Sequence, residues 1–232
     1  MEFVPASAAS VTAFLLIVGF VVVALLWAVH RAWRSIQITT NAAAVLAVWL
    51  GAQGVLVASG RMSSLPLNGL PFFFGPILII WTALALSPLG GKIAAQVPLA
   101  ALVAFQVFRL PLELVLHSWA AQRTIPGTMT WTGQNWDILS GILALACAPL
   151  AARYRGAAWF ANGVGFVLLL NVMRVAIMSS PVPFGWNTQP PLVLAFHLPY
   201  ALIGPVCVGG ALFGHLVLTR ALLTKQFPPP SS

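Results

Sequence analysis

The chain has 232 residues, of which 60% are hydrophobic and only 6% are charged, and its mean hydropathy is +0.96. A soluble domain carries about 25% charged residues, so this composition excludes a water-exposed globular domain and predicts a polytopic membrane protein. A helix needs about 20 apolar residues to cross a bilayer, which leaves room for about six to eight spans. The net charge of +8 comes from scattered cations without a basic stripe, so nucleic acid is not an expected partner.

The N-terminal apolar run, residues 11–29, is predicted to be the first span. Glu2 precedes this run, and His30, Arg31 and Arg34 follow it. A cleavable secretory signal has the opposite order, with basic residues first and a shorter apolar core. We therefore expect the segment to remain as a transmembrane helix.

Hydropathy, with Gly, Pro and charged residues as boundaries, divides the chain into seven predicted spans that form a single membrane domain, residues 1–232. The boundary between the third and fourth spans is the weakest, because only the short stretch 87–92 separates them. Pro199 and Pro205 predict a seventh span that is kinked or lies partly at the surface. A flexible tail is expected at 226–232. The predicted spans are 10–30, 40–59, 70–89, 93–121, 136–152, 157–178 and 190–219.

The cations predict the orientation, because cytoplasmic loops retain Lys and Arg. With seven spans, one side has only Arg61 and Arg123, whereas the other side has Arg31, Arg34, Lys92, Arg153, Arg155, Arg220 and Lys225. We therefore expect a multi-pass protein with its N-terminus outside and its C-terminus in the cytoplasm. The expected partners are the lipid bilayer and either a second membrane protein or another copy of the chain.

The predicted outer loops are rich in Pro, Gly, Asn and Trp, in contrast to the short basic inner loops. They comprise residues 59–71, 122–137 and 179–191. This composition favours ordered turns or re-entrant elements. If the protein handles a ligand, the outer half is where its site is expected.

Span four carries three polar residues, Arg109, Glu113 and His117, at intervals of four. This spacing places them on one helix face, at depths of about 18, 12 and 6 Å from the outer end. Pro111 predicts a kink beside them. The favoured interpretation is a structural ion pair between Arg109 and Glu113; a proton or ligand path and a catalytic role are the alternatives.

Spans five and six add polar residues at about the level of His117. Asn135 and Asp137 precede span five, where they suit an N-cap and the helix dipole. Asn171 and Arg174 share a face of span six. Arg174 is expected either to extend to the interface or to pair with Asp137 or Glu113, which would balance two cations against two anions.

Cys147, Arg174 and His197 occur in that order on consecutive spans, which resembles exosortases and archaeosortases. The resemblance implies a cysteine peptidase or transpeptidase with these three residues as its catalytic set. Depth argues against it, because Cys147 lies about 16 Å from the outer end, and Arg174 and His197 about 6 and 9 Å. Cys147 and Cys207 lack metal-ligand spacing and are expected to be small buried hydrophobic residues. His197 alone is expected to be a hydrogen-bonded packing residue, and His215 is left out of the predicted site.

Longer stretches resemble a bacterial family of small polytopic membrane proteins without an established function. They are FRLPLELVLH, IPGTMTWTGQNWDILSG and LLLNVMRVAIMSSPVPF, which contain the motifs R-x-P-x-E, N-[FW]-D-I-L-x-G and P-x-P-F. The resemblance implies a multi-span helical fold in a bacterial inner membrane, and no particular activity. It singles out Arg109, Pro111, Glu113, Pro126, Met129, Asn135, Asp137, Gly141, Asn171, Pro181, Pro183, Phe184, Gln189 and Pro190.

The sequence as a whole predicts an all-α bundle of seven transmembrane helices in which spans four to seven enclose a polar pocket open to the outer side. The leading functional hypothesis is non-enzymatic: binding or conduction of a small ligand or proton, or assistance in assembly. The exosortase-like enzyme is the alternative. No metal site is predicted and no cofactor is identified. The predicted ligand or proton cluster comprises Arg109, Glu113, His117, Asn135, Asp137, Asn171 and Arg174.

Overall fold

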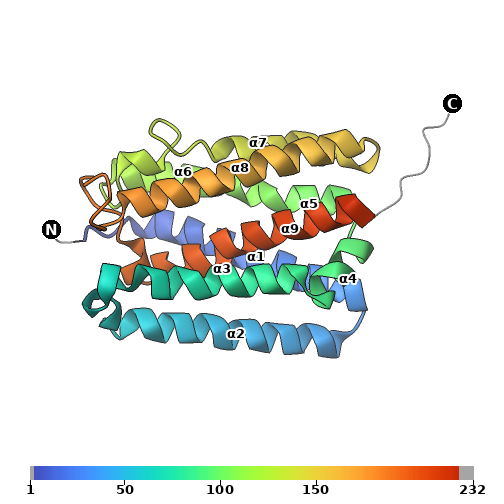
Figure 1. Cartoon of the computed structure of the whole chain (residues 1–232), viewed down its shortest axis with the longest axis horizontal. Helices are drawn as coiled ribbons and strands as arrows, with labels where there is room; N and C mark the ends of the chain where they lie inside the picture. Colours follow the sequence, from blue (N-terminus) through green and yellow to red (C-terminus); the bar gives the residue numbers. More distant parts are fainter. Residues whose placement is uncertain (1–2, 225–232) are drawn as a thin grey trace.

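The computed structural model describes residues 3–224, in which every regular element is helical and there is no strand. The predicted tail, 226–232, lies outside the described residues. Most helices run nearly parallel along one bundle (Figure 1). The α-helices are α1 (Ala8–Trp33), α2 (Ile36–Ala58), α3 (Leu70–Leu86), α4 (Pro88–Gln96), α5 (Leu99–Ala104), α6 (Arg109–Ala121), α7 (Ile138–Cys147), α8 (Arg155–Ser179) and α9 (Gly209–Thr224).

Several of these helices are long and apolar enough to cross a membrane. Five segments within the described residues meet this test, and α3 with α4 would make a sixth as one span bent by 59°. The segments are Ala8–Trp33, Ile36–Ala58, Leu99–Ala121, Arg155–Ser179 and Tyr200–Thr224. The fourth of the predicted spans, 93–121, thus begins later, because Val97 and Pro98 separate α4 from α5. A 3-10 turn, Phe105–Phe108, joins α5 to α6.

The fifth predicted span, 136–152, is wrong as a continuous helix. Helix α7 has only ten residues, about 15 Å, which is half of a bilayer core. Its start lies beside the middle of the α5–α6 segment, because a Cβ on Gly141 would meet the backbone of Leu110. The preceding residues, 122–137, form an irregular loop that extends to this point.

The seventh predicted span, 190–219, is also not one helix. Residues 190–199 are irregular apart from the short 3-10 turn Leu194–Phe196. The continuous segment begins as a 3-10 turn at Tyr200–Ile203, passes through a π-helical turn at Gly204–Val208, and continues as α9. Pro199 and Pro205 account for the irregular start, because neither has a backbone N–H for a regular helix. Where the sequence predicts a kink, the structure therefore has a change in helix type.

Helix α9 is the central element and α2 the peripheral one. α9 packs against α3, α4, α5 and α8, whereas α2 packs mainly on α1. Trp81 of α3 donates its indole N–H to the carbonyl of Pro205 at 2.8 Å, and Arg220 of α9 donates to the carbonyl of Ser87 at the α3–α4 bend at 2.8 Å. These contacts fix α3 against the central helix.

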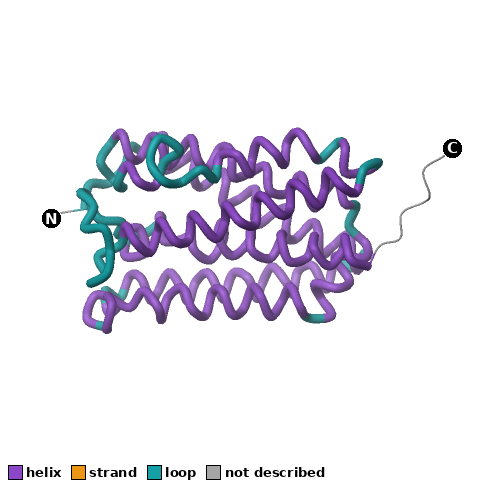
Figure 2. Tube along the Cα trace, turned by 45° about the horizontal axis from the view of Figure 1, so that its top comes forward, coloured by secondary structure: helices purple, strands orange, loops and turns teal. Residues whose placement is uncertain are grey.

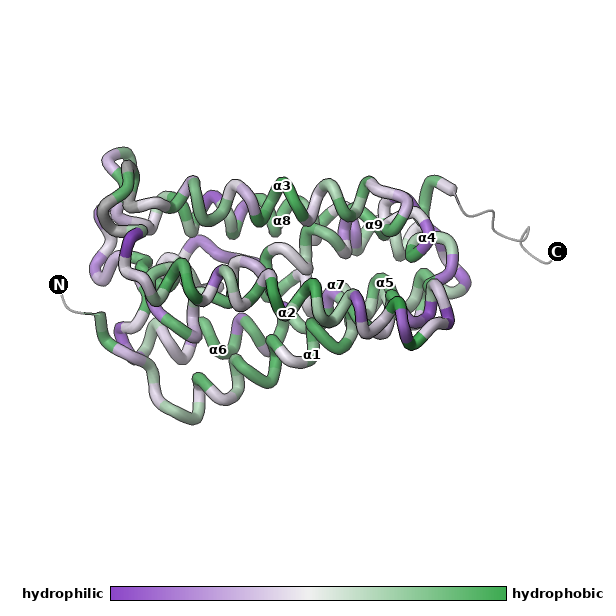
Figure 3. The backbone as a smooth tube through the Cα atoms, turned by 90° about the horizontal axis from the view of Figure 1, so that it is seen from below, coloured by the Kyte–Doolittle hydropathy of each residue, from purple (hydrophilic) through white to green (hydrophobic). Residues whose placement is uncertain are grey.

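The connections separate into two groups at opposite ends of the bundle. Residues 59–69, most of 122–137, and 180–199 lie at the end that holds the N-terminus, which we call the loop-rich end (Figure 1). Much of the non-helical chain gathers at this end (Figure 2). Shorter connections lie at the opposite end. Hydrophobic residues predominate between the two ends (Figure 3). This grouping of loops is the one that the seven-span prediction requires, while the orientation in a membrane stays a prediction.

Candidate functional site

Arg109 and Asp137 form a buried ion pair at the centre of the bundle. Arg109 is the first residue of α6, and Asp137 immediately precedes α7; they are 1% and 4% exposed. The guanidinium Nε donates to Asp137 Oδ2 at 2.6 Å, and Nη2 donates to Oδ1. Ser140 also donates to Oδ1, at 3.1 Å. The expected pair of Arg109 with Glu113 is therefore wrong, because the loop 122–137 brings in a carboxylate that meets the guanidinium with two bonds.

Arg109 also contacts α8 and α9. These contacts fix which nitrogen of the His215 ring carries the hydrogen. Its Nη1 donates to the carbonyl of Gly165 at 3.0 Å and lies 2.9 Å from His215 Nε2. A guanidinium has no acceptor, so Nε2 must accept and Nδ1 must carry the hydrogen. That Nδ1–H donates to Asn162 Oδ1 at 2.9 Å, and Asn162 donates to Thr219 Oγ1 at 2.7 Å. His215 is thus held as a neutral ring with both nitrogens bonded.

His215 and Asn162 are site residues that the sequence analysis missed. Both are buried, at 1% and 4% exposure, and both lie within apolar helices. A polar residue surrounded by apolar sequence in a span is itself a signal of an internal partner. The partners are 53 residues apart in the chain, so no local spacing connects them.

Glu113 lies one turn along α6 from Arg109 but belongs to a different set of contacts. Its Oε1 accepts from Asn135 Nδ2 at 2.8 Å. Asn135 donates again to the carbonyl of Met129 at 3.2 Å and accepts from the Asp137 N–H at 3.1 Å. The asparagine therefore connects Glu113 to the loop. The second carboxylate oxygen, Oε2, is buried and has no hydrogen-bond partner.

Arg174 and Asn171 lie outside this buried cluster. Asn171 donates to the carbonyl of Gln134 at 2.9 Å, and Arg174 donates to Asn171 Oδ1 at 3.0 Å. The Arg174 guanidinium also lies 5.4 Å from the centre of the Trp186 ring. The expected pairing of Arg174 with Asp137 or Glu113 does not form, because these surface contacts hold the side chain elsewhere. The buried cluster therefore contains one cation and two carboxyl groups.

His117 is not brought into the ion-pair cluster either. Its ring stacks on Trp131 of the loop, with ring centres 4.2 Å apart and planes inclined by 13°. Its Nδ1 is buried without a hydrogen-bond partner. The polar face predicted for span four thus divides among three partners: Asp137 for Arg109, Asn135 for Glu113, and Trp131 for His117.

The three residues of the exosortase-like alternative do not come together. Cys147 ends α7, next to the connection to α8, whereas Arg174 lies 19 residues after Arg155, the first residue of α8. That interval corresponds to about 28 Å of helix. His197 stacks on Phe3 at the loop-rich end, with ring centres 3.8 Å apart. Both cysteines are free and buried, and within residues 3–224 no cluster of His, Cys, Asp and Glu is suited to a metal.

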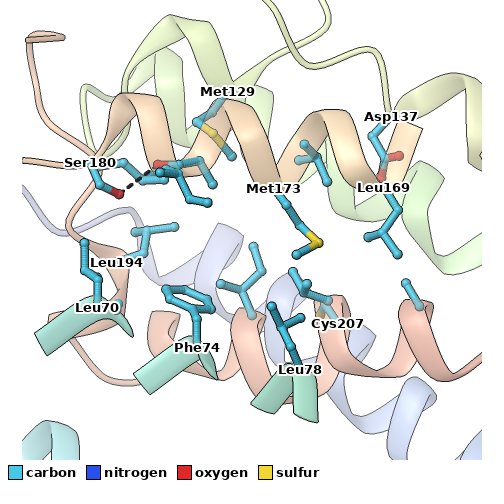
Figure 4. Close-up of a pocket in the computed structure, with 18 of the residues that line it drawn as sticks. Leu70, Phe74, Leu78, Met129, Asp137, Leu169, Met173, Ser180, Leu194 and Cys207 are labelled. Atoms are coloured by element: carbon cyan, nitrogen blue, oxygen red, sulfur yellow. Dashed lines mark hydrogen bonds between the residues drawn. The ribbon is translucent and has the colours of Figure 1, made fainter. Parts of the chain in front are cut away.

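A cavity of about 450 Å³ lies between α3 and α8, with the segment from Ile203 into α9 as its inner wall. Figure 4 shows Leu70, Phe74 and Leu78 of α3 facing Leu169 and Met173 of α8 across it. The wall is almost wholly apolar. Its charged members are Arg109, Glu113 and Asp137.

The cavity has an exposed apolar mouth and a buried inner end. Leu67, Ile177 and Phe184 line the mouth at the loop-rich end and are 39%, 50% and 58% exposed. Glu113 and Ala211 line the interior and are 1% and 2% exposed. A molecule in the cavity would therefore contact apolar side chains along its length and reach the Glu113 side chain inside.

Comparisons with known proteins do not assign the chain to a family: no protein-family model, curated protein or solved structure matches it. The two resemblances drawn from the sequence stay predictions. The functional argument depends on the geometry of the pocket and its charges.

Proposed function

We propose that the chain is a multi-pass membrane protein that binds a small, largely apolar ligand in the cavity between α3 and α8, with Glu113 as the ligand-pairing carboxyl group. The observation that carries this proposal is Glu113: the residue belongs to the wall of an otherwise apolar cavity, and its buried Oε2 has no hydrogen-bond partner. A buried polar group without a hydrogen bond costs about 1–3 kcal/mol. A ligand with a hydrogen-bond donor would remove that cost.

The proposed arrangement has seven passes, with the loop-rich end outside and the C-terminus in the cytoplasm. The distribution of Lys and Arg supports this orientation, and the similarity to a bacterial membrane-protein family supports a bacterial inner membrane. α7 and the loop before it would together make the fifth pass. The mouth of the cavity would then open at the level of the outer leaflet, from which an apolar ligand can enter directly.

Ligand binding is favoured over proton conduction by the state of His215. A proton relay would need this ring to gain and lose a proton, but Arg109 donates to Nε2 and Asn162 accepts from Nδ1–H. An arginine does not give up its proton in proteins. The hydrogen bonds of Arg109 and His215 therefore prevent proton transfer from Arg109 toward the opposite end of the bundle.

Photolabelling tests the proposal. The purified protein in phosphatidylcholine nanodiscs would be irradiated with a dodecanol that carries a photoreactive diazirine in its chain, and the labelled peptides mapped. We expect saturable labelling of the cavity wall on α3 and α8. Ala176→Phe, which adds a ring inside the cavity, should abolish it, whereas Val167→Phe, at a 64% exposed position outside the cavity wall, should not. Non-saturable labelling spread over all apolar surfaces would refute the proposal.

A further inference from the structure

We infer that the ligand is a single-chain amphiphile with a primary amine, which pairs with Glu113 while its alkyl chain extends toward the mouth of the cavity. This inference rests on the proposed function and adds the chemical class of the ligand. It follows from three features: the charge balance of the cluster, the saturation of Arg109, and the volume and direction of the cavity.

The charge balance favours an amine. Arg109 and Asp137 neutralise each other in their bidentate pair, and His215 is neutral. Because Arg174 is held outside the cluster, Glu113 has no cation of its own. An alkylamine supplies that cation, because a primary amine is an ammonium at neutral pH, and the ammonium in contact with the Glu113 carboxylate carries no net charge. Such a pair enters an apolar cavity as a neutral unit, and its attraction offsets the cost of leaving water.

An anionic ligand is disfavoured at the same place. Among the described residues of the cavity wall, Arg109 is the only cation, and four hydrogen bonds to Asp137, Gly165 and His215 already occupy its guanidinium. A second carboxylate would meet Glu113 and Asp137 as like charges. A fatty acid of the same length should therefore bind more weakly than the amine.

The size and direction of the cavity favour one alkyl chain. A volume of about 450 Å³ holds about 15 groups of the size of a water molecule, at about 30 Å³ each. Twelve methylene-sized groups and an amine fit this space. Because Glu113 is buried and the mouth is apolar, the nitrogen must lie inside and the chain must extend outward.

Competition against the photoreactive dodecanol tests this assignment. Dodecylamine, dodecanol and dodecanoate would compete at equal concentrations in the bilayer, with empty nanodiscs used to measure partitioning. In the unmodified protein we expect dodecylamine to compete best and dodecanoate worst. A hydrogen bond to a charged group contributes about 1.5–3 kcal/mol, so Glu113→Gln should weaken the binding of dodecylamine by about tenfold or more. The binding of dodecanol should change little.

A matched control is Gln53→Leu. Gln53 of α2 is also buried and also has an oxygen without a partner, but it is not on the cavity wall, so its replacement should leave the order of competitors unchanged. Thermal unfolding of each variant confirms that it is folded. Equal competition by amine and alcohol, or an amine preference that survives Glu113→Gln, would overturn the inference. In either case saturable labelling by the probe itself would still support the proposed function, whereas absence of that labelling would refute both.

Discussion

Arg109 and Asp137 illustrate how a buried charge depends on its partner. Asp137→Asn would leave the guanidinium charged and buried with only neutral partners, and removal of one member of a buried pair costs about 3–5 kcal/mol. We expect a loss of this size in the free energy of unfolding, measured by denaturant titration in mixed micelles. Arg109→Met combined with Asp137→Leu should recover only part of it, because His215 Nε2 and the Gly165 carbonyl would still lack their donor.

Glu113→Gln serves as the control for this prediction. Gln retains a side-chain oxygen that can accept from Asn135, and it removes no ion pair. Its effect on stability should therefore be much smaller than that of Asp137→Asn. A reversed order, with the larger loss at Glu113, would show that the cluster is organised around a different pair.

His197 lies outside the helices that could span a membrane, and its stability contribution should depend on pH. Its ring stacks on Phe3, and burial lowers the pKa of His197 below its ordinary value of 6.5. The unfolded chain then binds more protons than the folded one as the pH falls below 6.5. The stabilisation is therefore present above that pH and is lost as the pH falls toward the lower folded pKa.

The measurement is the unfolding temperature of the protein and of His197→Gln at about pH 7.5 and about pH 5.5. On acidification, the unfolding temperature of the unmodified protein should fall by more than that of His197→Gln. His30, His117 and His215 are present in both proteins, so their effects cancel in the comparison. An identical pH dependence of the two proteins would contradict the assignment.

Patterns in the sequence indicated where the polar residues lie better than they indicated which of these residues bond to one another. Arg109, Glu113 and His117 do lie on one helix, and Asn135 and Asp137 bond to Glu113 and Arg109. The partner of Arg109 is 28 residues away on a loop whose re-entrant path no periodicity encodes. Local spacing could therefore not choose between Glu113 and Asp137.

At the scale of helices, Gly165 determines how closely α8 approaches α9. A Cβ at this position would lie 2.7 Å from His215 Cε1 and 3.5 Å from Arg109 Nη1. We expect Gly165→Ala to lower the free energy of unfolding by about 1–3 kcal/mol through overpacking, although Ala favours helix by about 1 kcal/mol.

Gly163, one half-turn earlier on α8, provides the matched control. A Cβ there meets no atom within 4 Å, so Gly163→Ala should be neutral or stabilising by up to about 1 kcal/mol. Denaturant titration of both variants in the same micelles makes the comparison. A stabilising effect at Gly165 would mean that α8 and α9 pack less closely than described.

The long apolar elements were predictable and the short ones were not. Hydropathy gave α1, α2 and α8 nearly as they occur, because each is a continuous run bounded by polar or turn residues. It overextended the fifth and seventh predicted spans, 136–152 and 190–219, since apolar loops and half-length helices have the same composition as a span. Pro199 and Pro205 marked the irregular start of the last segment, but their presence did not specify a π-helical turn.

At the scale of the whole molecule, the proposed orientation predicts which end is accessible from outside. Asn187 is exposed at the loop-rich end, and Ala152 is exposed at the opposite end. In a background where Ala replaces Cys147 and Cys207, a membrane-impermeant maleimide should label Asn187→Cys in intact cells. It should label Ala152→Cys only after the membrane is opened. The reverse pattern would invert the orientation and place the mouth of the cavity in the cytoplasmic leaflet.

The most direct test of the central claim is a density map of the protein in nanodiscs with 12-bromododecylamine. The account predicts elongated density in the cavity, with the amine nitrogen within hydrogen-bond distance of Glu113 Oε2. It also predicts that the bromine lies toward the mouth, near Leu67, Ile177 and Phe184. An empty cavity under saturating amine, or density with the bromine beside Glu113, would contradict it.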